Sequence, residues 1–143
     1  MSIIVWDGKI LAADRSITSG DVKVEFRKLW EIDDGAIAGC GDMVSVETMR
    51  KWWMSGGDIN EWPECQNDAA KWATLVVVKH NDGIFYYEDK PISLPVYGFM
   101  AWGSGADIAI GALAAGANSI EAVMITCNHS PYCGLGCDSV KIY

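Results

Sequence analysis

Ser2-Ile3-Ile4-Val5-Trp6-Asp7-Gly8-Lys9-Ile10-Leu11-Ala12-Ala13-Asp14 opens the chain behind Met1 with two apolar runs on either side of Asp7-Gly8. Asp-Gly is one of the dipeptides favoured in the two-residue turns of β-hairpins. Both runs are apolar at successive positions, so each strand has both of its faces covered. The sequence therefore predicts a buried antiparallel hairpin at the start of the chain, ending at Asp14.

The remaining sequence alternates between strand and helix patterns. Turn signals such as Asp33-Asp34-Gly35 and Asn81-Asp82-Gly83 join pairs of predicted strands. Glu121 stands three residues after Asn118, the spacing of a helix capping box. We predict a loop over residues 17–22, strands over residues 23–32, 36–40, 75–78, 84–87, 97–102 and 137–143, and helices over residues 44–54, 106–115 and 118–128.

This order of elements predicts the fold class. Antiparallel strand pairs separate two groups of helices, which indicates two sheets packed face to face with helices outside them. The predicted fold is α+β, a four-layer αββα sandwich of antiparallel sheets. With 143 residues and a mass of 15.6 kDa, we expect one domain over residues 1–143.

The charge and hydropathy of the chain argue against two classes of partner, nucleic acids and membranes. The formal net charge is −8 and the isoelectric point is near 4.5, so a phosphate backbone would repel the chain and we expect no nucleic-acid partner. No apolar run approaches the roughly 18 residues of a membrane span, and no signal peptide opens the chain. We therefore expect a cytoplasmic protein without a membrane partner.

The five cysteines are the next candidates for chemistry. Their number is odd and their spacing irregular, which favours reduced thiols over a disulfide framework. Cys127, Cys133 and Cys137, with His129 between the first two, could be drawn as a zinc site, but the chain has no Cys-x-x-Cys pair. We expect neither a metal nor a cofactor.

Ser2, Asp14 and Lys28 form a second candidate set. A hydroxyl on the first residue left after methionine removal can be a nucleophile, with the α-amine of that residue as general base. A buried lysine held by a carboxylate would lower the effective pKa of the hydroxyl, and a backbone amide at Gly39 would bind an oxyanion. Each residue alone has an ordinary explanation. Ser2 can reflect a preference at translation starts, Asp14 can cap a turn, and Lys28 can lie on a solvated strand face. The hypothesis depends on the joint pattern.

Four motifs carry a resemblance to a known family: the opening segment with Asp14-Arg15, Arg27-Lys28-Leu29-Trp30-Glu31-Ile32, Ile37-Ala38-Gly39-Cys40-Gly41-Asp42 and Trp102-Gly103-Ser104-Gly105. They resemble the proteasome β-subunit superfamily of N-terminal nucleophile hydrolases, in particular small bacterial and phage relatives of the HslV peptidase. The resemblance spans nearly the whole chain and is strongest over residues 1–42 and 97–142.

The resemblance implies roles for five residues. Ser2 takes the place of the family's catalytic threonine, Asp14 that of its acid and Lys28 that of its lysine. Gly39 matches the oxyanion-hole amide, and Ser104 matches the serine that supports the amine of the nucleophile.

Three positions depart from the family pattern. Besides serine for threonine at Ser2, Ser130 stands where the family has an acid and Cys133 where it has a hydroxyl. Losing the acid weakens the network that orients the α-amine. The amine is free only after Met1 is removed, because a retained Met1 would turn it into an amide that cannot act as a base.

Three functions remain open. The first is a proteasome-like peptidase or amidohydrolase that works through an acyl-enzyme on Ser2. The second is a degenerate bacterial or phage protein that keeps the fold for a structural, binding or inhibitory role. The third is a thiol enzyme using Cys40 or Cys133, which ranks last because the sequence offers no partnered base.

The resemblance also implies partners. Relatives form rings, and an ATP-driven unfoldase feeds unfolded protein to HslV-like peptidases. We expect a homo-oligomer that acts on polypeptides or small amides; any ATPase must be a separate subunit, because the chain has no nucleotide-binding motif. Four tryptophans near the first predicted helix either mark a subunit contact or simply cover the sheet: Trp52, Trp53, Trp62 and Trp72.

Overall fold

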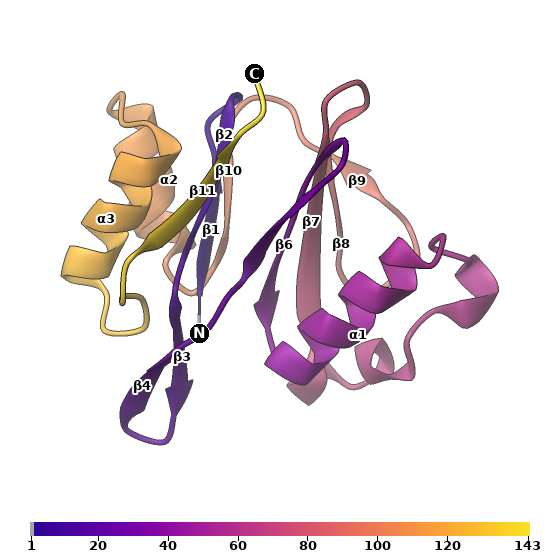
Figure 1. Ribbon diagram of the computed structural model, residues 1–143. Helices are drawn as coiled ribbons and strands as arrows, with labels where there is room; N and C mark the ends of the chain where they lie inside the picture. The colour runs from indigo at the N-terminus through magenta and orange to yellow at the C-terminus, as the bar shows by residue number, and fades with distance from the viewer. Residues whose placement is uncertain (1) are drawn as a thin grey trace.

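Two antiparallel sheets form the centre of the computed structural model, which describes residues 2–143 (Figure 1). The first sheet has the strand order β10-β1-β2-β11, where β1 is Ile3–Trp6, β2 Ile10–Asp14, β10 Met100–Gly103 and β11 Cys137–Lys141. The second has the order β5-β6-β7-β8-β9, where β5 is Leu29–Ile32, β6 Gly35–Gly41, β7 Ala73–Lys79, β8 Gly83–Tyr87 and β9 Leu94–Pro95.

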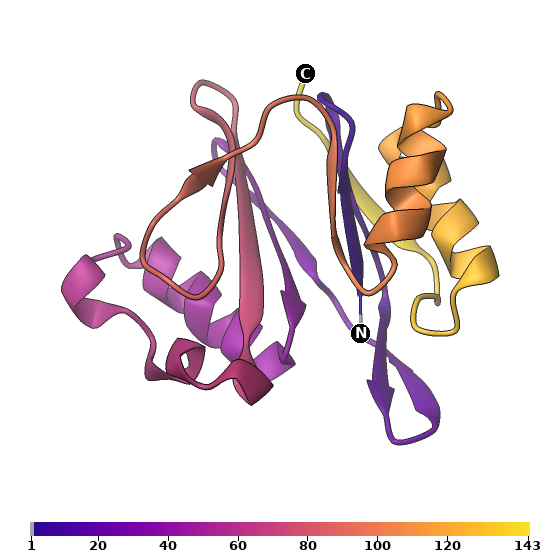
Figure 2. The same ribbon diagram turned by 180° about the vertical axis from the view of Figure 1, so that it is seen from behind.

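Helices cover the outer face of each sheet. Helices α2 (Ala106–Ala114) and α3 (Ser119–His129) lie outside the first sheet, and α1 (Met43–Met54) lies outside the second, as both views show (Figure 2). The four-layer αββα sandwich predicted from the order of elements is confirmed. None of the helices in residues 2–143 is long and apolar enough to cross a membrane.

Three apolar cores hold the layers together. The core between the two sheets includes Ile4, Trp102 and Val76, whose side chains are almost completely buried. A second core joins the first sheet to α2 and α3, and a third joins the second sheet to α1. Because β1 and β2 contribute to cores on both of their faces, their sequences are apolar at successive positions, as the sequence predicts for a doubly covered hairpin.

The segment from residue 16 to residue 28 differs from the prediction. Instead of a loop followed by one long strand, a separate hairpin extends beyond the sheets, made of β3 (Ser16–Ser19) and β4 (Val22–Glu25) (Figure 1). Gly20 has φ of 61° at its turn, where glycine adopts a left-handed conformation without steric cost. The chain then leaves the strand over residues 26–28 and begins β5 at Leu29.

The connection between α1 and β7 contains three short 3₁₀ turns, at Ile59–Glu61, Glu64–Asn67 and Ala69–Lys71. The buried amide of Gln66 fixes this connection to β7. Its Nε2 donates to the carbonyl of Ala73 over 2.8 Å, and its Oε1 accepts from the N–H of Ala73 over 3.0 Å. The fixed connection presents Trp72 at the end of the second sheet, where its side chain is 42% exposed.

The other tryptophans of this region cover the sheet. The rings of Trp52 and Trp62 stack edge to face with centroids 4.9 Å apart, and Trp52 makes a similar contact with Tyr87 at 5.2 Å. Trp52, Trp62 and half-buried Trp53 all belong to the core under α1. Of the two interpretations of these tryptophans, packing within the subunit accounts for these three, and Trp72 stands apart from them.

Candidate active site

Asp14 lies at the end of β2 and is completely buried. Its Oδ1 accepts hydrogen bonds from the N–H of Ile3 (3.0 Å) and from Nζ of Lys28 (2.8 Å). Its Oδ2 accepts from the hydroxyl of Ser16 (2.9 Å) and from the N–H of Gly134 (3.1 Å). One carboxylate therefore joins β1, the start of β3, the segment before β5 and the turn before β11.

Lys28 is the partner of Asp14 and is also completely buried. Removing an ion pair from water costs several kcal/mol per charge, and folding alone rarely requires such a pair. Lys28 occupies its position because the chain breaks out of the strand pattern at residues 26–28 and turns this side chain inward. Oδ1 of Asp14 accepts from both the Lys28 ammonium and the N–H of Ile3, so this oxygen connects Lys28 to the peptide that links Ser2 to Ile3.

Ser2 directly precedes β1 and is 2% exposed. Its Oγ is buried and makes no hydrogen bond to any other residue in the 2–143 range. The hydroxyl of Ser104 donates to the carbonyl of Ser2 over 3.5 Å, a long hydrogen bond. Gly103 lies against that same carbonyl so closely that a Cβ would overlap it, which explains the glycine before Ser104. The structure thus brings Ser2, Asp14, Lys28 and Ser104 together.

Gly39 has a different position from the one expected of an oxyanion-hole residue. Its N–H donates to the carbonyl of Lys28 over 3.0 Å, so it is not available to a substrate. A Cβ on Gly39 would overlap the side chain of Val46, so the glycine allows α1 to pack closely on β6. This corrects the assignment of the oxyanion amide to Gly39.

The amide of Gly41 is better placed. Successive N–H groups of an extended strand point to opposite sides, so the N–H of Gly41 points to the same side as that of Gly39. Strand β5 begins at Leu29, which pairs with Ala38, so it does not extend far enough to cover Gly41. Gly41 also lines the cleft that contains Ser2.

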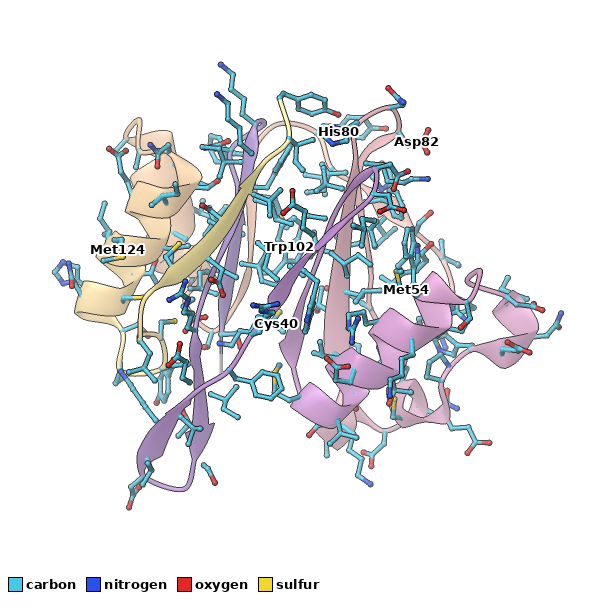
Figure 3. The ribbon with its side chains drawn as sticks, in the orientation of Figure 1. Cys40, Met54, His80, Asp82, Trp102 and Met124 are labelled. Carbon is cyan, nitrogen blue, oxygen red and sulfur yellow. The ribbon has the colours of Figure 1, made fainter. Side chains whose placement is uncertain are left out.

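That cleft has a volume of about 670 Å³. Its lining includes Ser2 and Ser104, residues 17–19 of the protruding hairpin, and residues 40–43 and Trp72. Figure 3 shows Cys40 from β6 and Trp102 from β10 between the two sheets, where both belong to the central core. Among the lining residues outside the four motifs, the sequence analysis names only Trp72 individually, and it gives that residue no catalytic role.

Ser130 and Cys133 act on the site through the backbone. Ser130 ends α3, and its hydroxyl accepts a hydrogen bond from the N–H of Tyr132 over 3.3 Å. Cys133 is completely buried, and its carbonyl accepts from Nζ of Lys23 over 2.9 Å. The next residue, Gly134, supplies the N–H that Asp14 binds. Ser16 and Gly134 are therefore site residues that the sequence analysis misses.

The thiols of this region are poor nucleophiles. Burial raises the pKa of Cys40 to about 12 and those of Cys127 and Cys137 to about 11. Burial, and then the negative charge of Asp14, also raise the pKa of Cys133. No three His, Cys, Asp or Glu side chains of residues 2–143 gather in a metal-binding arrangement. These surroundings disfavour the thiol-enzyme hypothesis.

Comparison with known proteins rests on structure. No protein-family model matches the sequence, and no curated protein matches it. A Thiobacillus denitrificans protein named BPH, solved in complex with epoxomicin, superposes with a TM-score of 0.76 at 17% identity, covering 100% of both chains. Another structure of BPH gives 0.72 at 19% identity, covering 99% of this chain and 98% of the other.

A third solved structure, the eukaryotic HslV from Trypanosoma brucei, has a TM-score of 0.65 at 20% identity and covers 97% of each chain. Identities this low establish the fold and not the activity. All three matches span almost the full length of both partners, so the similarity concerns the complete sandwich. The chain therefore has the HslV-like, proteasome-type fold of the N-terminal nucleophile hydrolases.

Proposed function

We propose that this protein hydrolyses peptide or related amide bonds with Ser2 as its nucleophile. The observation that carries the proposal is the completely buried ion pair of Asp14 and Lys28 beside Ser2. Burying an ion pair costs free energy because both charges lose their hydration, and buried charges beside a cleft are typical of functional sites. The hydroxyl of Ser2, which makes no hydrogen bond within residues 2–143, supports this assignment.

In the proposed reaction, the Ser2 hydroxyl attacks the carbonyl carbon of the scissile amide and passes its proton to the free α-amine. The positive charge of Lys28 favours the developing serine oxyanion, and Asp14 holds the ammonium in place. The N–H of Gly41 stabilises the oxyanion of the tetrahedral intermediate. The α-ammonium then protonates the leaving amine, and water hydrolyses the acyl-enzyme, restoring Ser2.

The mechanism requires removal of Met1, which lies outside the described residues. Without that step the nitrogen of Ser2 belongs to a peptide bond and cannot accept a proton. Ser104 supports the nucleophile by its contact with the carbonyl of Ser2. Ser130 and Cys133 serve only to hold the turn that presents the N–H of Gly134 to Asp14.

The deciding experiment is the intact mass of the untagged protein before and after treatment with epoxomicin, the compound bound in one BPH structure. We expect loss of the methionine mass and one inhibitor adduct that maps to Ser2. Ser2→Ala should abolish the adduct, while Ser119→Ala, which alters a buried serine outside the cleft, should keep it. A retained Met1 with no adduct would refute the proposal.

One observation favours a second candidate, a proteasome fold kept for a structural, binding or inhibitory role. Neither Ser130 nor Cys133 makes a side-chain hydrogen bond to Ser2 in the described part of the chain, and the Cys133 thiol is buried in the core under α2 and α3. The network that would orient an α-amine therefore contains fewer side-chain hydrogen bonds than the sequence resemblance implies. A retained Met1 would support this candidate.

For partners, we infer a homo-oligomer, with any ATP-driven unfoldase as a separate subunit. The inference rests on the fold shared with HslV and on apolar side chains that a single copy leaves exposed. The polypeptide substrate would reach Ser2 through the cleft between the β3–β4 hairpin and residues 40–43.

A further inference from the structure

One wall of the cleft, the part of its lining that residues 40–43 and Trp72 provide, combines one aromatic side chain with one negative charge. Trp72 is 42% exposed, although it is attached to a connection that Gln66 fixes to β7. Asp42 is its neighbour across the end of the sheet, because the N–H of Asp42 donates to the carbonyl of Trp72 over 3.0 Å. Both residues line the cleft.

Only one of the two carboxylate oxygens of Asp42 accepts hydrogen bonds within residues 2–143. Its Oδ2 caps α1 by accepting from both the N–H and the hydroxyl of Ser45, each over 3.0 Å. Its Oδ1 has no hydrogen bond to any residue that the structure describes. Oδ1 of Asp42, a residue that lines the cleft, can therefore accept a further hydrogen bond or ion pair.

Asp42 is also the only charged residue among those of 2–143 that line the cleft, since no Lys, Arg or His lies in the lining. The formal net charge of the whole protein is −8, which adds a negative potential around the cleft. The charge of Asp42 and the net negative charge of the protein would both favour binding of a cationic side chain and both disfavour binding of an acidic one. Aromatic faces bind cations as well, most strongly in tryptophan.

We propose that this cleft selects polypeptides with a basic residue, arginine or lysine, close to the bond that is cleaved. The aliphatic part of that side chain packs on Trp72, and its charged end pairs with Oδ1 of Asp42. This inference deepens the proposed function, because it names the substrate class of the same site. Binding through this wall does not need the Ser2 hydroxyl, so selectivity and chemistry can be tested separately.

The test compares peptide epoxyketones that differ only in the residue next to the warhead: arginine, its neutral isostere citrulline, and glutamate. We expect arginine to label Ser2 about fivefold faster than citrulline and at least tenfold faster than glutamate at low salt. Because the preference is electrostatic, 1 M NaCl should largely remove the difference between arginine and citrulline.

Two variants locate the selectivity. Asp42→Asn keeps a good helix cap and should bring the ratio of arginine to citrulline close to one. Asp58→Asn is the matched control, because Asp58 caps a 3₁₀ turn by accepting from Asn60 and does not line the cleft. Equal labelling by arginine and citrulline, or an Asp42→Asn variant that keeps the preference, would overturn the proposal.

A second readout uses Ser2→Ala protein and the corresponding acetylated peptide amides, followed by NMR of the tryptophan indole N–H signals. Trp72→Phe identifies the signal of Trp72 among the seven tryptophans. If the epoxyketones fail to react but the arginine peptide shifts the Trp72 signal at lower concentration than citrulline, the proposed hydrolysis fails and the selectivity stands. If no peptide shifts that signal, the selectivity is wrong.

Discussion

At the scale of single residues, Asp14 organises the site. Its two oxygens accept four hydrogen bonds shorter than 3.2 Å, from Ile3, Ser16, Lys28 and Gly134. Because the carboxylate is fully buried, each donor that it binds is fixed in position, and water does not compete with these donors for its oxygens. Any change in its charge therefore affects both the stability of the fold and the environment of Ser2.

Asp14→Asn should cost about 3–5 kcal/mol of unfolding free energy, because it removes the carboxylate charge that forms a fully buried ion pair with Lys28. Labelling of Ser2 by epoxomicin should be lost at the same time. The control is Asp138→Asn, which breaks the 2.6 Å pair with Arg15, where the two side chains are 40% and 24% exposed. That pair should contribute less than about 1 kcal/mol by urea denaturation. Equal losses would contradict the central role of Asp14.

The buried thiol of Cys40 and the half-buried thiols of Cys127 and Cys137 predict how stability depends on pH. The folded-state pKa is about 12 for Cys40 and about 11 for Cys127 and Cys137, above the ordinary thiol value. The unfolded chain therefore loses these protons first as pH rises, and deprotonation favours unfolding. We expect the thermal midpoint to fall as pH rises from about 9 to 11. Cys40→Ala, Cys127→Ala and Cys137→Ala combined should flatten this slope; an unchanged slope would exclude the thiols as its cause.

At the scale of elements, the contact of α1 with β6 limits which residues the second sheet can carry. Gly39 lies directly under Val46, which is fully buried. The glycine that resembles part of a catalytic motif in the sequence is thus explained by packing. The same close approach places the first turn of α1, with Asp42 at its cap, beside the cleft.

Gly39→Ala should destabilise the protein by about 1–3 kcal/mol through overpacking against Val46. The double variant Gly39→Ala/Val46→Ala should lose less than the sum of the two single variants, since each change makes room for the other. Urea denaturation of the four proteins measures this coupling. Additive losses would show that Gly39 is needed for another reason.

Elements with strong local signals could be predicted from the sequence. The hairpin around Asp7-Gly8 was expected, and the capping box was too: Asn118 accepts from the N–H of Glu121, and Glu121 accepts from that of Asn118. The β3–β4 hairpin is missed although Gly20-Asp21 is a usual turn pair, because β4 is exposed throughout and β3 is buried only at Ser16, so neither strand has an alternating apolar face.

The site was only partly predictable for the same reason. Ser2, Asp14, Lys28 and Ser104 belong to recognisable motifs, and the structure brings them together. Gly134 serves Asp14 with a backbone N–H, and such a role leaves no trace in the residue type. Trp72 reaches the cleft only because a buried glutamine fixes its connection, which is a tertiary effect.

At the scale of the whole molecule, the segment after β8 is the main feature that one copy leaves unexplained. Tyr97 is 87% exposed and Ile92 is 62% exposed, and Leu94 and Phe99 are also exposed in the same stretch. Apolar side chains gathered on one surface are typical of protein contacts. The surface formed by Ile92, Leu94, Tyr97 and Phe99 is the one we expect another copy to cover.

Light scattering coupled to size exclusion should therefore give a mass that is a multiple of 15.6 kDa. Tyr97→Glu should shift the protein toward the monomer, because it places a charge within that surface. Tyr132→Glu changes a tyrosine that is 49% exposed in the turn after α3, and it should leave the assembly intact. A monomeric wild-type protein would contradict the inferred oligomer.

The bond between Asp14 and the N–H of Gly134 spans 120 positions of the chain. During synthesis, Asp14 is made 120 residues before the amide that completes its set of hydrogen-bond donors. The N-terminal hairpin can form early, but Asp14 cannot reach its final set of partners until β11 has been made and paired with β2. The complete set of donors around Asp14 therefore exists only in the folded domain, because no short piece of the chain contains both Asp14 and Gly134.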